Sequence, residues 1–193
     1  MAKWISFNYE DDVGLFGIMD IDLIIEHEGD FFEIPKPTGR KIPFNDVQLL
    51  APLEPNSIFA LWNNFHERAV KEEHTIPADS VYFMKPLSSV IGPEQTIYRP
   101  QGYQGRVIFE AELGIVIGSK CREVSELEAE EYIFGYTCVN NVTDVEFLFE
   151  NKAFQQWTRC KGFDTFTPIG PCIETEIDLD VVKVKALQNG ATK

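Results

Sequence analysis

Two carboxylates stand two residues apart in an otherwise apolar stretch of the chain, Glu110 and Glu112 within residues 107–118. If this stretch is a β-strand, side chains two residues apart point to the same face, so both carboxylates leave the strand side by side. Phe109 and Ala111 then point to the other face. The spacing therefore predicts a paired-carboxylate site on one face of a strand.

Such a pair needs a neutralising partner, because like charges repel and a buried carboxylate costs on the order of several kcal/mol. A hard divalent cation such as Mg²⁺, Mn²⁺ or Ca²⁺ prefers oxygen ligands and would neutralise both groups. The alternative is an edge strand with one wet face, in which alternating glutamates are ordinary. The apolar continuation at 115–117 favours a buried strand.

The composition is that of an ordinary globular chain with a strong negative charge. Its 193 residues are enough for one medium domain, alone or with a small appendage, and the net charge is −14. A surface of this charge repels nucleic acid and anionic membranes, so neither is expected as a partner. A local cationic pocket can still hold a small anionic substrate.

The cysteines and the apolar segments indicate a cytoplasmic protein. Cys121, Cys138, Cys160 and Cys172 have no CxxC spacing, which favours reduced thiols over a disulfide framework or a zinc site. We expect no leader peptide at the N-terminus, and no apolar stretch approaches the roughly 20 residues that span a bilayer. The expected location is therefore the cytoplasm.

The order of short elements predicts a small β-rich module at 1–46, followed by a larger unit at 47–193. Strands are predicted at 4–9, 15–19, 22–25, 47–53, 58–62, 81–86, 107–118, 134–139, 173–177 and 181–187. Helices are predicted at 63–74, 125–133 and 144–157, the second of which begins with a capping box of Ser125 and Glu128.

Asn189 and Gly190 form a strong hairpin signal close to the last residue of the chain. A hairpin needs a returning strand, and only three residues follow. We therefore expect a sheet that is cut off before its return strand.

Five stretches occur in an order that is more informative than any one of them alone. They read Leu-Leu-Ala-Pro at 49–52, Tyr-Phe-Met-Lys-Pro at 82–86, Phe-Glu-Ala-Glu-Leu-Gly-Ile-Val-Ile-Gly at 109–118, Gly-Tyr-Thr-Cys-Val-Asn-Asn-Val-Thr at 135–143 and Lys-Gly-Phe-Asp-Thr-Phe-Thr-Pro-Ile-Gly-Pro at 161–171. Together they resemble the fumarylacetoacetate hydrolase family over roughly residues 47 to 193.

The resemblance implies an α+β fold that is mostly β, a mixed β-sandwich roll with short peripheral helices after the small β-rich N-terminal module. It also implies a homodimer with Mg²⁺, Mn²⁺ or Ca²⁺ at the site. Members of the family act on small 2-oxo or 1,3-diketo acids by carbon–carbon hydrolysis, decarboxylation, or keto–enol and double-bond isomerisation. A metal chelated by a keto acid would stabilise the enolate that these reactions share.

The same resemblance implies which residues form the site. The metal ligands would be Glu110, Glu112 and Asn141, with Asp144 as a further candidate. By the same resemblance Lys161 would be catalytic, and the substrate would be held by Asn64, Phe65 and Lys85. His66 and Glu67 are further catalytic candidates because of their place in the same turn, and not because the resemblance implies them.

Departures from the family pattern fall within the site itself. Asn141 stands where the family has an aspartate, and because an amide supplies no charge, metal affinity should fall. Asp144 would compensate if the chain were already helical there. Val145 replaces an arginine of the family and Leu148 replaces a glutamine.

A second set of departures lies in the strand-to-helix segment, where the family uses a histidine and a glutamate to orient and activate water. Arg68 and Lys71 stand at those two positions. His66 and Glu67 lie within the same turn and are the candidates to replace them, His66 as a general base or as an exposed helix residue.

The sequence leaves two functions open. One is a metal-dependent hydrolase, decarboxylase or isomerase of small oxo acids with an altered site. The other is a non-catalytic homologue that serves as a structural or partner subunit. The family's C-terminal segment with Gly-Thr-Pro is not found, so we expect a fragment or a shortened member.

Overall fold

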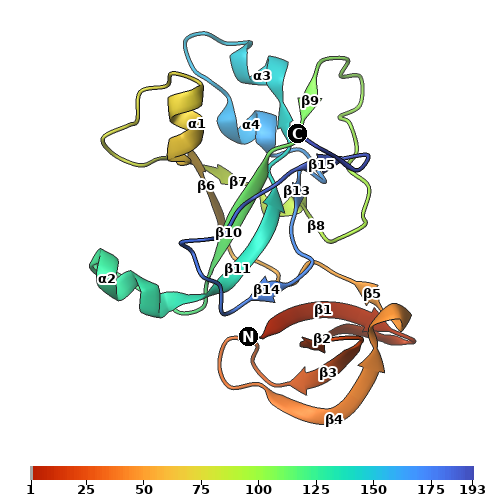
Figure 1. Ribbon diagram of the computed structural model, residues 1–193. Helices are drawn as coiled ribbons and strands as arrows, with labels where there is room; N and C mark the ends of the chain where they lie inside the picture. Colours follow the sequence, from red (N-terminus) through yellow and green to blue (C-terminus); the bar gives the residue numbers. More distant parts are fainter. Residues whose placement is uncertain (1) are drawn as a thin grey trace.

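One antiparallel sheet runs through the molecule and joins its two ends. The computed structural model describes residues 2–193. The sheet has eight strands in the order β10-β11-β14-β1-β2-β3-β4, with β5 paired to β1. These strands are β1 (Lys3–Tyr9), β2 (Asp12–Asp20), β3 (Leu23–Glu28), β4 (Lys36–Pro43), β5 (Gln48–Leu49), β10 (Ala111–Ile117), β11 (Ile133–Asn140) and β14 (Ile173–Glu174). Figure 1 shows β1–β4 in a lower lobe and β10 and β11 in an upper lobe, with β14 between them.

The remaining strands form two-stranded sheets in the upper lobe. They are β6 (Ile58–Trp62) with β7 (Val81–Lys85), β8 (Val90–Ile91) with β13 (Thr167–Pro168), β9 (Val107–Ile108) with β12 (Thr143–Asp144), and β15 (Leu187–Gln188) with β16 (Ala191–Thr192). The fold is therefore mostly β, as the sequence predicted.

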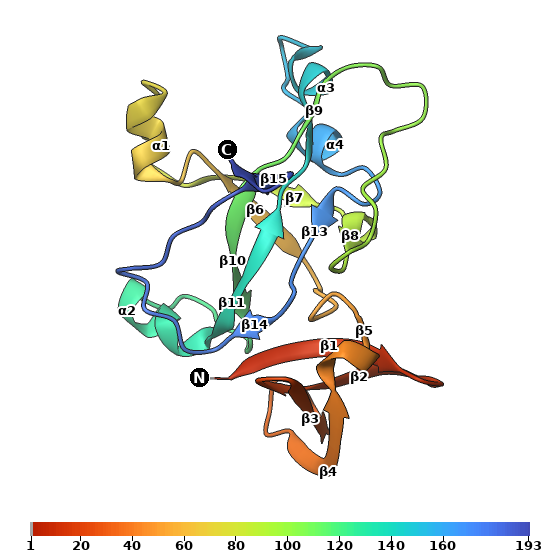
Figure 2. The same ribbon diagram turned by 45° about the vertical axis from the view of Figure 1, so that its right-hand side comes forward.

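Short helices complete the structure. They are α1 (His66–Lys71), α2 (Glu126–Ala129), α3 (Val145–Phe149) and α4 (Trp157–Lys161), with 3₁₀ turns at Phe44–Asp46, Leu87–Ser89 and Glu130–Tyr132. Figures 1 and 2 show α1, α3 and α4 at the upper end of β10 and β11, and α2 at their lower end. Of these helices, α1 and α4 carry cations that pair with Glu110.

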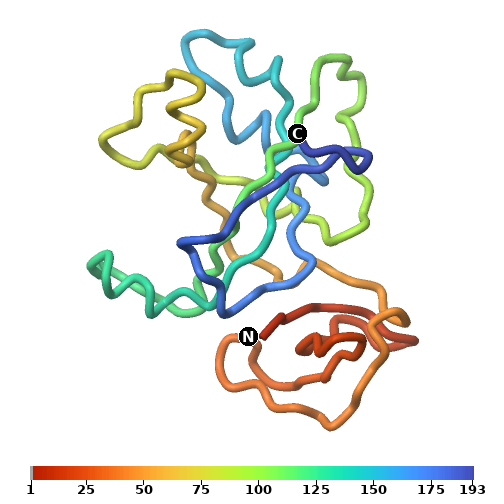
Figure 3. Tube along the Cα trace, viewed as in Figure 1, coloured from red at the N-terminus to blue at the C-terminus, as the bar shows by residue number. Residues whose placement is uncertain are grey.

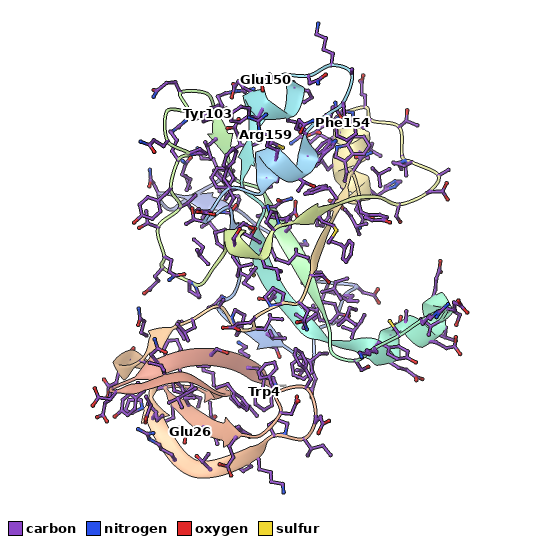
Figure 4. All side chains as sticks on the ribbon, turned by 180° about the vertical axis from the view of Figure 1, so that it is seen from behind. Trp4, Glu26, Tyr103, Glu150, Phe154 and Arg159 are labelled. Atoms are coloured by element: carbon purple, nitrogen blue, oxygen red, sulfur yellow. The ribbon has the colours of Figure 1, made fainter. Side chains whose placement is uncertain are left out.

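The two faces of β1 serve two different cores, because side chains alternate along a strand. Ile5 and Phe7 point into the lower lobe, where they pack with the buried Ile24 and Ile42. Trp4 points the other way and packs against β10 and β14. In Figure 4, Trp4 and Glu26 lie in the lower lobe, at the opposite end of the molecule from Tyr103, Glu150, Phe154 and Arg159.

Several predicted elements differ from the structure. The strands expected at 47–53 and 173–177 are each two residues long, and the helix expected at 63–74 is confined to α1. The strand expected at 107–118 is interrupted at Phe109 and Glu110, between β9 and β10. The helix expected at 144–157 is two separate helices, α3 and α4, and most of the strand expected at 181–187 is irregular. The capping box of Ser125 and Glu128 is confirmed, although α2 has only four residues before a 3₁₀ turn follows.

The expectation that the chain stops before its return strand is wrong. Asn189 and Gly190 adopt positive φ angles of 52° and 79°, as a type I′ hairpin turn requires. Leu187 pairs with Thr192, so the three residues after the turn are enough to close a small hairpin. Figure 3 shows this blue segment crossing the upper lobe to reach the C-terminus.

The two lobes share backbone hydrogen bonds through β14. Trp4 pairs with Ile173, and Glu174 pairs with both Lys3 and Tyr136. Ile173 is fully buried at this junction. The division at residue 46 stays a prediction, and the structure adds that one continuous sheet crosses it.

The junction gives a test of the fold. Ile173→Ala removes a fully buried side chain and should reduce the free energy of unfolding by about 2–5 kcal/mol. Ile115→Ala is the matched control, because Ile115 on the neighbouring β10 is 54% exposed, and its cost should stay below about 1 kcal/mol. Urea denaturation measures both, and equal losses in the two variants would contradict the junction.

Candidate active site

The two carboxylates belong to one cluster of hydrogen-bonded side chains at the upper end of β10. Glu112 lies in β10, and Glu110 stands directly before it. The backbone of Glu110 is held on both sides, because its N–H donates to Asn140 Oδ1 (3.2 Å) and its C=O accepts from the Asn141 N–H (2.9 Å). The predicted side-by-side arrangement therefore survives the break in the strand.

Lys161 is the immediate partner of Glu110. It ends α4, its side chain is only 3% exposed, and its ammonium makes a close ion pair with Glu110 Oε2. The same ammonium lies 2.5 Å from the hydroxyl of Thr143, which donates to Glu110 Oε2 at 3.0 Å. The lysine that the sequence singled out as catalytic is thus at the carboxylate pair.

Lys85 is buried beside this pair, and its contact with substrate stays a prediction. From the end of β7 its ammonium donates to Asn141 Oδ1 (2.7 Å), to the Lys161 carbonyl (2.5 Å) and to the Phe166 carbonyl (3.3 Å). All three of its N–H groups are used inside the protein, and its side chain is buried.

Burial, together with the neighbouring Lys161, lowers the pKa of Lys85 to about 7. A neutral amine has only two N–H groups, whereas three oxygens surround this nitrogen. The ammonium form is therefore the one that satisfies the site as it stands.

Asn141 links the two halves of the cluster, and its amide has one orientation that fits. Its Oδ1 accepts from the buried ammonium of Lys85, and its Nδ2 donates to Glu112 Oε1 at 3.0 Å. The residue is 2% exposed. Because the ammonium can only donate, the amide oxygen must face Lys85 and the amide nitrogen must face Glu112.

Asp144 does not join the carboxylates, contrary to the prediction. Residues 143 and 144 form β12, so their side chains point to opposite faces, and Thr143 is the one that faces Glu110. Asp144 instead accepts from the N–H of Phe147 at 3.1 Å and caps α3. The sequence predicted that Asp144 would compensate for Asn141 only if a helix had already formed at residue 144. Asp144 lies in β12, directly before α3, so this condition is not met.

The helix α1 brings Arg68, and not the residues predicted from it, toward the pair. Arg68 Nη1 lies 3.7 Å from Glu110 Oε1 while its Nε donates to Glu72. Asn64, Phe65, His66 and Glu67 are exposed. Within residues 2–193, no hydrogen bond or ion pair joins these four to Glu110 or Glu112.

Two site residues escaped the sequence-based prediction. Thr143 could have been found from strand alternation, since it is two residues from Asn141. Arg68 was noted only as a departure from the family, because nothing in the sequence places α1 beside β10. Leu148, which also departs from the family pattern, is 6% exposed and lies on the buried side of α3.

The donor groups do not fit a resident divalent cation bound by three protein oxygens. Among residues 2–193, no three His, Cys, Asp or Glu side chains converge closely enough to hold a metal ion. One oxygen of Glu110 carries the Lys161 ammonium, and Asn141 presents N–H to Glu112. This leaves two carboxylates as possible ligands, whereas Mg²⁺ and Ca²⁺ sites in proteins usually have additional oxygen ligands.

The pKa of Glu112 reflects its buried position and its neighbours. Burial raises the pKa of Glu112, and the nearby charge of Glu110 raises it further, while the hydrogen bond from Asn141 opposes the shift. Glu112 therefore takes up a proton at a higher pH than an exposed glutamate does.

A groove lies on the opposite face of the same strand. It is lined by Phe109, Ala111, Cys138, Asn140 and Leu187, among others. Because Phe109 and Ala111 alternate with the two glutamates, the groove and the carboxylates are on different sides of β10.

Comparisons with known proteins identify the family of this chain. A family model described as fumarylacetoacetate (FAA) hydrolase C-terminal matches residues 57–193. The chain belongs to the fumarylacetoacetate hydrolase family. A second model, described as Rv2993c-like, N-terminal, matches residues 2–52.

Relatives in the fumarylacetoacetate hydrolase family are similar along most of the chain. Protein Rv2993c of Mycobacterium tuberculosis is 37% identical over 173 residues, which are 88% of this chain and 63% of that protein. An uncharacterised protein of Archaeoglobus fulgidus is 39% identical over 152 residues, 79% of this chain and 59% of its own length. The chain thus spans about three fifths of these curated relatives.

A crystal structure of 5-carboxymethyl-2-hydroxymuconate delta-isomerase from Mycobacterium smegmatis has a TM-score of 0.87 at 34% identity. The match covers 98% of this chain and 73% of that one. Maleylpyruvate hydrolase from Sphingobium sp. SYK-6, solved with manganese(II) and pyruvate, has a TM-score of 0.65 at 23% identity, with 93% and 68% of the chains covered. The second likeness shows the fold alone.

Residues 2–193 contain no helix that is both long and apolar enough to cross a membrane.

The burial of α4, which positions Lys161, can be tested through the adjacent thiol. Burial raises the pKa of Cys160 to about 11, whereas Cys121 is exposed. Since the thiolate is the reactive form, a short iodoacetamide pulse at pH 8 should label Cys121 and spare Cys160 until the protein is unfolded in urea. Peptide mass spectrometry reads out both sites, and equal labelling in the folded protein would contradict the placement of α4.

Proposed function

We propose that this chain carries out proton transfer on a small 2-oxo or 1,3-diketo acid, as a keto–enol or double-bond isomerase of the fumarylacetoacetate hydrolase family. The observation that carries this proposal is the asymmetry of the carboxylate pair. Glu110 is engaged by the Lys161 ammonium, while Glu112 accepts one hydrogen bond from the Asn141 amide.

Glu112 is the proposed base. An isomerase of this kind removes a proton from a carbon next to a carbonyl and returns it elsewhere, so one carboxylate that can both accept and release a proton is enough. The raised pKa of Glu112 brings that group closer to the pH at which it works. Glu110 would keep Lys161 in place beside it.

Arg68 is the proposed partner of the substrate carboxylate. Its guanidinium is half-exposed, and its contact with Glu110 is long at 3.7 Å. The planar fork of an arginine can bind a carboxylate through two parallel hydrogen bonds. The ammonium of Lys161, two bonds of which are used by Glu110 and Thr143, would favour the negative charge of the enolate at close range.

Hydrolysis is less well supported by the same residues. The family positions that activate water hold Arg68 and Lys71 here, and neither cation accepts a proton at neutral pH. Isomerisation needs no activated water. The similar structure named as a delta-isomerase supports the same choice.

A non-catalytic partner subunit is the second candidate. It is favoured by the internal balance of the site, in which Glu110, Glu112, Lys85 and Lys161 satisfy one another without a ligand. The homodimer that the resemblance implies stays a prediction.

The two candidates differ in one measurement. In D₂O, the chain should exchange the C3 protons of a 2-oxo acid such as 2-oxobutanoate faster than buffer, as followed by NMR in the presence of EDTA. Glu112→Gln should lower that rate by about 10²–10⁴-fold, because it removes the base. Glu126→Gln, on the exposed α2, is the matched control and should be unchanged. Wild-type exchange at the buffer rate for a panel of 2-oxo and 1,3-diketo acids would leave the non-catalytic candidate.

The role of α1 can be tested separately. Arg68→Met should raise KM by about 10-fold with a smaller change in kcat, since a hydrogen bond to a charged group contributes about 1.5–3 kcal/mol when buried and less at this half-exposed side chain. His66→Ala should leave kcat/KM within about twofold. A large loss of kcat/KM in His66→Ala, with little change in Arg68→Met, would instead support His66 as the general base that the sequence suggested.

A further inference from the structure

We infer that Asn141 makes this site independent of a divalent cation, with the Lys161 ammonium and the Asn141 amide in the positions that metal bonds to Glu110 and Glu112 would take. The inference concerns metal demand alone and does not rest on the proposed isomerisation.

The first argument is the direction of the Asn141 amide. To offer its oxygen to a cation beside Glu112, the side chain would have to turn its NH₂ group toward the ammonium of Lys85. That would place donor against donor at a contact now 2.7 Å long, between two residues that are 2% and 3% exposed. A buried charge that loses its acceptor is strongly disfavoured. An aspartate escapes this conflict, because both of its oxygens accept.

The second argument is the charge of the cluster. The two glutamates already face positive partners, because Lys161 and Arg68 form ion pairs with Glu110, and Asn141 joins Lys85 to Glu112. A divalent cation would add two further positive charges beside them in a poorly solvated region. An aspartate at position 141 would add a negative charge beside Glu112, and a cation would be attracted more strongly.

The third argument is the position of Lys161. Its ammonium already occupies Glu110 Oε2, and its side chain is 3% exposed. A cation that bound this oxygen would have to displace the ammonium from it. The contacts of Lys161 with Thr143 and of Lys85 with the Lys161 carbonyl hold it in place.

The experiment compares the wild type with four variants by calorimetric titration with MnCl₂ and by the electron paramagnetic resonance signal of free Mn²⁺. The wild type should bind more weakly than about 1 mM. Asn141→Asp should bind one Mn²⁺ at least about 10-fold more tightly, because it adds an oxygen ligand and a negative charge. Lys161→Gln should also gain affinity, because it frees Glu110 while keeping an N–H donor.

Asn140→Asp is the matched control. It adds the same charge at the neighbouring position and keeps the oxygen that accepts from the Glu110 N–H. Its side chain lines the groove on the other face of the strand. It should therefore bind Mn²⁺ no better than the wild type.

Thermal unfolding guards against a variant that folds poorly. Asn141→Asp carries an unbalanced charge, so its Tm should fall in EDTA and rise with Mn²⁺, since a ligand that binds only the folded state stabilises it. The Tm of the wild type should be the same in EDTA and in Mn²⁺.

Two results would overturn the inference. One is a wild type that binds a single Mn²⁺ at micromolar concentration and loses it in Glu112→Gln. The other is Asn141→Asp and Lys161→Gln variants that are folded and bind no more tightly than Asn140→Asp. A failure to exchange oxo-acid protons would affect neither readout.

Discussion

The contact between the Lys161 ammonium and the Glu110 carboxylate is the interaction on which the rest of the site depends. A carboxylate this close to the interior needs a counter-charge, and an ammonium that is 3% exposed needs one even more. To bring the two together, α4 must end beside β10, and β12 must place Thr143 between them. The short elements of the upper lobe are arranged around that requirement.

A second buried cation extends the same constraint. Lys85 is satisfied by two backbone carbonyls and by Asn141, and Asn141 then has only its N–H group left for Glu112. A chain of hydrogen bonds therefore runs from Lys85 through Asn141 to Glu112. The Lys85 ammonium orients the Asn141 amide, and this orientation turns the amide N–H toward Glu112. Such a fully paired network is rigid, because any single break leaves a buried polar group without a partner.

The departures from the family pattern also fit this electrostatic description. An amide at 141 removes a negative charge, and Arg68 and Lys71 add positive charge where the family has a histidine and a glutamate. Of these residues, Arg68 brings its positive charge to within 3.7 Å of Glu110. Val145 has the opposite effect on the charge, because an uncharged side chain stands where the family has an arginine.

The sequence by itself determined the parts that depend on local spacing. Alternation predicted that Glu110 and Glu112 share a face, the capping box marked the start of α2, and the Asn189–Gly190 turn marked a hairpin. The mostly β fold class was implied by the family resemblance of five stretches in order, and the short alternating strands along the chain agree with it.

Only the tertiary structure decided which groups meet the carboxylates. Whether Asp144 or Thr143 faces Glu110 depends on the pairing of β12 with β9, since an extended residue and a helical one point in different directions. Lys85 and Lys161 are 76 residues apart, and their contact arises from the packing of β7 against α4. Local spacing contains no such information, because a buried charge selects its partner by proximity in space.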